Sequence, residues 1–210
     1  MSDKGGKAPE RAKRTALERA KRTALERAKR TALERAKRTA LERAKRVRLM
    51  LFDVDGVLTD GKLWYGPAGE ALKAFHVLDG HGIKLLMQTG IAVGLLSGRN
   101  SPAVAVRAGE LGIPHVLQEI DDKRAAFEAL AAKLGIAADE TGFMGDEVVD
   151  LPVLRRCGFA CAPAQAHERV RAVAHYVTRA AAGGGAAREA CEFVLRAQGR
   201  LEAAFARYLA

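Results

Sequence analysis

From residue 47 onwards, short apolar runs alternate with stretches of helical composition. The runs are four to eight residues long, which is typical of strands, whereas the stretches between them are typical of helices. This alternation predicts a doubly wound α/β fold, in which helices cover both faces of an open, mostly parallel sheet. Strands are predicted at residues 47–54, 91–96, 115–118, 142–145, 159–162 and 175–178, and helices at 81–89, 101–111, 122–134, 148–156 and 186–209.

The segment after the first predicted strand has a different pattern. Residues 61–66 and 71–77 flank a turn that contains Pro67 and Gly69. This spacing predicts a small β-hairpin, although the second arm also has helical character. Only about 20 residues are available before the next turn, at Asp79. The insertion is therefore large enough for a hairpin and too small for a further domain.

Charge is distributed unevenly along the chain. The 210 residues include 35 Lys and Arg against 25 Asp and Glu, a net charge of +10. Residues 1–48 alone hold 18 basic and 6 acidic side chains, which leaves 17 basic and 19 acidic ones for the rest. The size and balance of the remainder suit one globular domain. We therefore predict a basic arm over residues 1–46 and a single domain over residues 47–210.

The basic arm is a repeat. The octet ERAKRTAL occurs four times without change from Glu10 to Leu41, and a fifth copy ends at Arg46. Its composition, with Lys and Arg three and four residues after each Glu, favours an exposed helix of roughly 55 Å, the alternative being a disordered arm. A period of eight residues rotates successive leucines by about 80°, so no coiled-coil seam is encoded. The leucines concerned are Leu17, Leu25, Leu33 and Leu41.

Two interpretations of the arm stay open. A polybasic segment attracts the phosphates of RNA, DNA or an anionic membrane. The other interpretation is a solvated extension without a partner. The octets contain no aromatic residue for base stacking and no wide apolar face for insertion into lipid, which favours the second interpretation.

Membrane-spanning and exported proteins are disfavoured by the sequence. Its apolar stretches are well short of the ~20 residues that a spanning helix needs. The N-terminus has no apolar segment of the kind found in secretory signals. The three cysteines, Cys157, Cys161 and Cys191, are odd in number and lack the spacing of zinc ligands. We therefore expect free thiols and a cytoplasmic location.

Chemically active side chains follow the predicted strands. In an open α/β sheet, ligands bind beyond the carboxyl ends of the strands. Asp53 and Asp55 come directly after the first strand, where two such acids require a cation or a proton to compensate them. A hydroxyl and backbone amides after the second strand can hold a phosphate. The further candidates at strand ends or at the start of the third helix are Ser97, Gly98, Arg99, Lys123, Asp146, Glu147 and Asp150.

The ordered set of DxDxxT, a later Ser, a Lys and a Gly-Asp-acid group resembles the haloacid dehalogenase superfamily of phosphohydrolases. The strings FDVDGVLTDG, GEALKAFHVLDGHGIKLL, SGRNSPAV and GDEVVDLPVL are similar to those of one branch without a cap domain. That branch is the 3-deoxy-D-manno-octulosonate 8-phosphate phosphatase family, and the similarity extends along the whole domain.

This resemblance implies a Mg²⁺-dependent phosphomonoesterase. Its substrate would be the eight-carbon sugar acid phosphate that leads to the lipopolysaccharide inner core of Gram-negative bacteria. Asp53 would be the nucleophile that forms an aspartyl-phosphate, and Asp55 the general acid and then the general base. Mg²⁺ would be held by Asp53, by the backbone carbonyl of Asp55 and by Asp146.

The resemblance also implies roles for the other motif residues. Ser97, Gly98 and Lys123 would bind the phosphate oxygens. Arg99 is a candidate for the substrate carboxylate, and Arg188 is a weaker one. Supporting roles near the metal and the motif loop fall to Thr59, Glu147 and Asp150.

Two positions depart from the family pattern. Glu147 stands where the family usually has a second Asp, and Gly184 stands where a basic residue is common.

The family is tetrameric, with hairpins around a central axis and a neighbour's C-terminal segment at each site, so we expect a homotetramer. The alternatives are a phosphatase for a nine-carbon sugar acid 9-phosphate and a non-catalytic scaffold with a nucleic-acid-binding arm.

Overall fold

The N-terminal octets form one long helix, α1 (Lys7–Ala44), in a computed structural model that describes residues 7–67 and 69–209. Of the two states expected for the arm, helical or disordered, the described part is helical. Strong helix formers and ion pairs one turn apart stabilise such a helix. The first six residues of the predicted arm lie outside the described residues.

The two octet leucines whose side chains are described differ in burial. Leu25 is 54 % exposed, whereas Leu41 is half-buried. The side chains of Leu17 and Leu33 lie outside the described residues. Residues 21–28 are all exposed and span more than two turns, so every face of the helix is exposed at Leu25.

The chain divides into two compact units between Arg38 and Thr39, so the second unit begins inside the last complete octet. Ala40 and Ala44 are buried in the core of this second unit together with Val47. We therefore propose that the globular domain starts at Thr39, eight residues before the predicted boundary.

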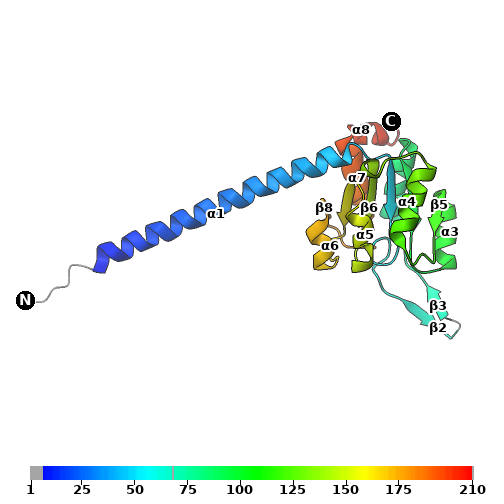
Figure 1. The fold of residues 1–210 in the computed structure, drawn as a ribbon, viewed down its shortest axis with the longest axis horizontal. Coiled ribbons are helices and arrows are strands. Elements are labelled where there is room, and N and C mark those ends of the chain that lie inside the picture. Colours follow the sequence, from blue (N-terminus) through cyan, green and yellow to red (C-terminus); the bar gives the residue numbers. More distant parts are fainter. Residues whose placement is uncertain (1–6, 68, 210) are drawn as a thin grey trace, which may run out of the picture. The chain divides into compact units, whose positions relative to one another are not determined.

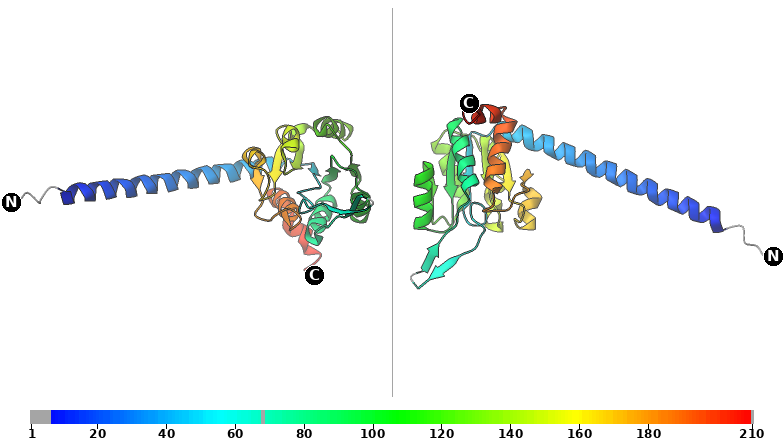
Figure 2. Two further views of the ribbon diagram at one scale, coloured as in Figure 1. Left: turned by 90° about the horizontal axis from the view of Figure 1, so that it is seen from below. Right: turned by 180° about the vertical axis from the view of Figure 1, so that it is seen from behind.

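A six-stranded, all-parallel sheet forms the centre of the second unit (Figures 1 and 2), which confirms the predicted fold class. The strands lie in the order β5-β4-β1-β6-β7-β8. The chain thus moves outward in one direction from β1 to β5 and in the other from β6 to β8. In chain order the strands are β1 (Leu49–Phe52), β4 (Ala92–Leu96), β5 (His115–Leu117), β6 (Thr141–Met144), β7 (Phe159–Ala162) and β8 (Tyr176–Val177).

Alternate residues of each strand face two separate cores. Met50 and Phe52 of β1 belong to one apolar cluster, whereas Leu49 and Leu51 belong to the other. The first cluster includes α2 (Val77–Gln88), α3 (Pro102–Leu111), α7 (Ala186–Ala197) and α8 (Leu201–Ala206). The second includes α4 (Lys123–Lys133), α5 (Leu151–Leu154) and α6 (Glu168–Val173). Because both faces are covered, the strands are apolar on both sides, as parallel strands usually are.

Two predicted helices are interrupted. The segment 148–156 begins as a 3₁₀ turn, η2 (Val148–Asp150), and continues as the four-residue helix α5. Pro152 has no N–H to donate to the carbonyl of Val148, so one regular helix cannot run through this segment. A further 3₁₀ turn, η1 (Ala138–Glu140), was not predicted, and neither was α6.

The predicted closing helix over residues 186–209 is likewise two helices, α7 and α8. Gly199, between them, has a left-handed backbone with φ +67°. Such a residue ends a helix, and glycine adopts this conformation without steric cost. The side chain of Gln198 donates hydrogen bonds to the carbonyls of Ala44 (3.3 Å) and Val47 (2.8 Å), which secures the turn.

The predicted hairpin is present, and its second arm is a strand. The strands β2 (Trp64–Gly66) and β3 (Gly69–Leu72) pair in antiparallel fashion with an irregularity at Trp64 and Tyr65. Figure 1 shows the hairpin projecting from the end of the domain at which the β-strands point. Among the described residues, no helix combines the length and the apolar composition required to cross a membrane.

Candidate active site

The candidate site lies where β1, β4 and β6 end, at the reversal of strand order. This is the place at which open parallel sheets bind ligands. A cavity of about 290 Å³ opens there. Its lining contains most of the predicted site residues and is formed by Asp53, Asp55, Gly56, Gly61, Ser97, Gly98, Arg99, Lys123, Asp146, Glu147 and Val149.

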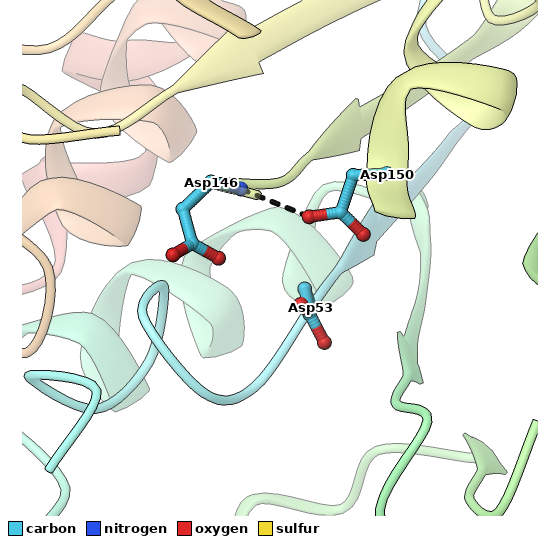
Figure 3. A group of neighbouring side chains, drawn as sticks. All are labelled: Asp53, Asp146 and Asp150. Carbon is cyan, nitrogen blue, oxygen red and sulfur yellow. Dashed lines mark hydrogen bonds between the residues drawn. The ribbon is translucent and has the colours of Figure 1, made fainter. Parts of the chain in front are cut away.

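Three carboxylates gather at the base of the site (Figure 3). One oxygen each from Asp53, Asp146 and Asp150 lies within 4.8 Å of the others. Asp53 follows β1 directly, Asp146 follows β6 by two residues, and Asp150 ends the 3₁₀ turn η2. Since β1 and β6 are paired neighbours, their sequence-distant acids meet at one edge of the sheet.

Lys123, the first residue of α4, compensates part of this negative charge. Its Nζ lies 2.9 Å from Oδ2 of Asp53 and 2.7 Å from Oδ1 of Asp150. Burial opposes a charge on this lysine, but the two carboxylates outweigh that effect and raise the pKa of Lys123. The lysine therefore stays protonated and offers a fixed positive charge at the cavity.

Asp150 is already occupied by protein partners. Its Oδ1 accepts a hydrogen bond from Lys123, and its Oδ2 accepts from the backbone N–H groups of Asp146 (3.0 Å) and Glu147 (3.2 Å). It is fully buried. Asp150 therefore holds the backbone of Asp146 and Glu147 in place. Asp53 also has protein partners, because its Oδ1 accepts from the N–H of Val54 at 2.7 Å and its Oδ2 pairs with Lys123. Asp146 differs from both in having a buried oxygen without a partner among the described residues.

The remaining carboxylates fit a divalent cation chemically. Oδ1 of Asp146 is buried and has no hydrogen-bond partner in the described structure. Burial raises the pKa of Asp146 to about 7, and Asp53 and Asp150 add to the shift. The pKa of Asp53 is also raised to about 7. Burial is the largest cause, the charge of Asp150 is the second, and Lys123 acts in the opposite direction. A hard cation bound by oxygen ligands would relieve this uncompensated charge.

The loop after β1 is shaped to approach Asp146 closely. Gly56 has φ +79°, and a Cβ at this position would lie 2.0 Å from Oδ2 of Asp146. Only glycine avoids that overlap. Buried Thr59 holds the loop, because its Oγ1 accepts from the N–H groups of Gly56 (3.4 Å) and Gly61 (3.3 Å).

Ser97 and Gly98 follow β4 and line the same cavity. The buried Ser97 hydroxyl accepts a hydrogen bond from the N–H of Arg99 at 3.2 Å. The Arg99 guanidinium contacts the hydroxyl of Tyr65 at 3.0 Å and the carboxylate of Glu70 at 3.2 Å. The β4 end therefore presents a hydroxyl and a cation to the cavity, and the cation is attached to the hairpin.

Asp55 lies at the mouth of the site and is also attached to the hairpin. Its Oδ1 forms an ion pair with Lys73, just beyond β3, and its Oδ2 lies 3.7 Å from Nε of Arg99. Sequence reasoning assigned no role to Lys73 and Glu70, although both lie in the string GEALKAFHVLDGHGIKLL that carries the family resemblance. They follow none of the parallel strands, so the rule that ligands bind at strand ends did not single them out.

The other two predicted residues lie further from the carboxylates. Glu147 is exposed at the rim of the cavity, and its carboxylate accepts from the N–H of Val148. Arg188 is not among the cavity-lining residues of the described structure. Its side chain pairs with Glu192 at 2.5 Å and lies over the ring of Phe205.

Comparison with known proteins identifies this arrangement. The haloacid dehalogenase-like hydrolase family matches residues 111–189. The 3-deoxy-D-manno-octulosonate 8-phosphate phosphatase KdsC of Escherichia coli K12 is 44 % identical over 158 residues, which cover 75 % of this chain and 84 % of that protein. The phosphatase of the same name from Yersinia pestis is 42 % identical over the same length.

Solved structures agree with the sequence relatives. The 3-deoxy-D-manno-octulosonate 8-phosphate phosphatase of Moraxella catarrhalis, in complex with magnesium, phosphate and KDO, has a TM-score of 0.78 and 41 % identity, covering 80 % of this chain and 97 % of that one. The cobalt-bound phosphatase of Haemophilus influenzae has a TM-score of 0.75 and 41 % identity, covering 76 % and 94 %. The chain thus belongs to the 3-deoxy-D-manno-octulosonate 8-phosphate phosphatase family of haloacid dehalogenase-like hydrolases, as its motifs predict.

Proposed function

We propose that this protein is a Mg²⁺-dependent phosphatase that hydrolyses 3-deoxy-D-manno-octulosonate 8-phosphate to the free sugar acid and inorganic phosphate. The observation that carries the proposal is the meeting of Asp53, Asp146 and Lys123 in one cavity. A nucleophilic carboxylate, a cation site and a buried ammonium are the groups that phosphoryl transfer requires. The relative from Moraxella catarrhalis, solved with magnesium, phosphate and KDO, supports both the substrate and the metal.

The metal would be held by Asp53 and Asp146, together with the backbone carbonyl of Asp55. The unpartnered, buried oxygen of Asp146 supports this choice. When bound, Mg²⁺ neutralises charge on the phosphoryl oxygens and helps to orient them.

In the first step, a carboxylate oxygen of Asp53 attacks phosphorus. The bond between phosphorus and the sugar oxygen breaks, and an aspartyl-phosphate forms. Asp55 donates a proton to the departing oxygen, so the sugar leaves as an alcohol rather than as an alkoxide. Lys123 holds the Asp53 carboxylate in place and stabilises negative charge that develops on the transferring group.

In the second step, a water molecule attacks the same phosphorus atom. Asp55, now a carboxylate, accepts a proton from that water, and the bond to Asp53 breaks. Inorganic phosphate and the original Asp53 carboxylate result, so the cycle closes without another reactant.

Substrate recognition would fall to the β4 end of the site. The Ser97 hydroxyl and the backbone at Gly98 would bind phosphate oxygens. Arg99, which reaches the cavity from the same turn, would bind the substrate carboxylate. Arg188, which pairs with Glu192 within this chain, would contribute only from a neighbouring subunit.

The two departures from the family pattern are compatible with activity. Glu147 lies at the cavity rim, where its longer side chain would still reach a metal-bound water. Gly184 lies in the turn between β8 and α7, with its N–H donated to the carbonyl of Ala181. The missing cation there would weaken contacts with an anionic substrate.

A substrate comparison tests this proposal. Phosphate release from the eight-carbon acid 8-phosphate and from a nine-carbon acid 9-phosphate would be measured with Mg²⁺ and with EDTA. We expect the first substrate to give the higher kcat/KM, and EDTA to abolish turnover. Asp53→Asn should lower kcat by at least about 10³-fold because the nucleophile is lost, whereas the control Asp121→Asn, at an exposed carboxylate, should not. Unchanged turnover in Asp53→Asn would refute the mechanism, and preference for the nine-carbon acid would refute the substrate.

We also propose a homotetramer assembled through the hairpin. Apolar side chains on the hairpin and the start of α2 are exposed in the single chain, including Trp64 at 55 % and Leu72 at 68 %. Large exposed apolar groups this close together mark interaction surfaces. Light scattering of the full chain should give four times its mass, and Leu72→Glu should reduce it.

We propose a cytoplasmic location on the evidence of the thiols. Cys157, Cys161 and Cys191 are all buried and unpaired. Free thiols persist in reducing compartments.

A further inference from the structure

The hairpin delivers a buried lysine to the active site. The side chain of Lys73 is only 1 % exposed, although it follows directly after the short strand β3. Its ammonium group forms an ion pair with Oδ1 of Asp55 and lies 3.3 Å from Oε2 of Glu70. A lysine is rarely buried to this extent, and its charge requires such partners.

Glu70 connects this lysine to a second cation. The Glu70 carboxylate accepts hydrogen bonds from the guanidinium of Arg99 at 3.2 Å and from the hydroxyl of Ser101 at 2.7 Å. Arg99 in turn lies 3.7 Å from the other oxygen of Asp55. Asp55 is therefore flanked by two cations, and Glu70 links both of them to the hairpin.

Asp55 depends on external contacts for its orientation. It lies in the turn after β1, outside any helix or strand. A proton donor must lie within hydrogen-bond reach of the leaving oxygen, and a displacement of about 1 Å costs up to 10²-fold in rate. Lys73 is not among the described residues that line the cavity, so it acts on the reaction through Asp55.

We propose that Lys73 is a positioning residue that fixes the carboxyl group of Asp55 for proton transfer, and that Glu70 fixes Lys73. This inference rests on the proposed role of Asp55 as the general acid. It assigns the hairpin a part in catalysis within its own chain, in addition to any part in assembly.

Two substrates with different leaving groups test the proposal. The sugar phosphate expels an alkoxide that needs a proton, whereas 2,4-dinitrophenyl phosphate expels a stable anion that does not. In Lys73→Met, we expect the first phosphoryl transfer from the sugar phosphate, measured by rapid quench in a single turnover, to slow by about 10²-fold. The burst of dinitrophenolate should change less than about threefold, because that step does not use the general acid. The KM for either substrate should stay within about threefold.

Matched variants separate positioning from folding. Lys62→Met removes a lysine of the same hairpin that is 71 % exposed and pairs with Asp60, and it should leave both rates unchanged. Lys73→Arg should restore part of the lost rate, and Glu70→Gln should slow the sugar phosphate by about tenfold. The rise in Tm that Mg²⁺ produces should be the same in all variants, because Asp53 and Asp146 are intact.

The outcomes distinguish this inference from the proposed function. Equal losses with both substrates, or no loss with either, would overturn the positioning role of Lys73. If the unaltered protein did not hydrolyse the eight-carbon acid phosphate, the proposed substrate would be wrong. The same leaving-group comparison would then use another alkyl phosphate that the protein accepts, and would still decide the role of Lys73.

Discussion

At the scale of single residues, the protonation of Asp53 and Asp146 makes the stability of the protein depend on pH and on a bound cation. Burial and neighbouring carboxylates raise both pKa values from 3.8 to about 7 in the folded chain. The unfolded chain releases these protons near pH 4. Between about pH 4 and pH 7 the folded state therefore binds more protons, and the free energy of unfolding of the cation-free protein falls as the pH rises. The loss is nearly complete about one pH unit above the folded-state pKa values.

A divalent cation should reverse this loss, since it competes with the same protons. We expect Mg²⁺ at about 100 times its Kd to add about 2.7 kcal/mol at pH 8.5, or about 5–10 °C in Tm, and almost nothing at pH 5.5. Thermal unfolding in EDTA and in Mg²⁺ at both pH values measures this. The control Asp146→Asn should show no Mg²⁺ effect. Equal shifts at both pH values would contradict the prediction.

Glu119 carries backbone strain beside the site. Among the described residues it is the single non-glycine with positive φ, at 58°. A left-handed conformation costs an L-residue about 1–2 kcal/mol. Glu119→Gly should therefore raise stability by about 0.5 kcal/mol, after the larger entropy of the unfolded glycine chain is subtracted. Urea unfolding measures this, with Glu128→Gly inside α4 as a control that should lose about 1 kcal/mol. Lower stability of Glu119→Gly would show that its side chain matters more than the strain.

Helices α2 and α7 are joined at the element scale by a buried carboxylate. Asp79, in the first turn of α2, accepts hydrogen bonds from the N–H groups of Gly185 (3.2 Å) and Arg188 (2.8 Å), at the start of α7. The two helices also pack closely, because a Cβ on Gly82 would lie 2.9 Å from Cα of Arg188. A side chain of α2 thus caps the N-terminus of α7.

Removal of this cap should be costly. Asp79→Ala leaves the buried N–H of Gly185 and the partly buried N–H of Arg188 without their acceptor, and we expect a loss of about 3 kcal/mol in the free energy of unfolding. Asp79→Asn keeps one acceptor oxygen and should lose less. The N-cap of α4, Asp122, is exposed, so Asp122→Ala should lose only about 1 kcal/mol. Chemical unfolding of the three variants gives the order, and a reversed order would refute the capping argument.

The elements also explain which parts of the site were predictable. Asp53, Ser97 and Asp146 follow parallel strands, so strand pairing brings them to one cavity, as their positions at strand ends indicated. Their catalytic and binding roles stay predictions. Lys73 and Glu70 reach the site through contacts with Asp55, Arg99 and Ser101, and position relative to a parallel strand does not predict such contacts. The helix interruption at Gly199 was missed because α7 and α8 have similar composition.

At the scale of the whole molecule, we expect the domain that starts at Thr39 to be active and stable without the arm that precedes it. Deletion of residues 1–38 should leave kcat within about threefold and change Tm little, because no site residue is removed. Deletion of residues 1–46 also removes Ala40 and Ala44, which are 2 % and 0 % exposed, and should lose about 2 kcal/mol. Activity and Tm of the two truncations test this. A large loss of kcat in the shorter deletion would contradict the interpretation of the arm as a solvated extension, as would strong RNA binding that the deletion abolishes.

The burial of Ala40 and Ala44 has a consequence for how this protein can vary in length. Every octet upstream has the same sequence as the one that enters the core, so gain or loss of a whole octet leaves the anchoring alanines unchanged. Each such step would alter the helix by about 12 Å. A gain or loss of any other number of residues within the repeat would break its phase where it occurs. The length of the arm can therefore change in steps of eight residues, while the residues that anchor it in the globular domain stay the same.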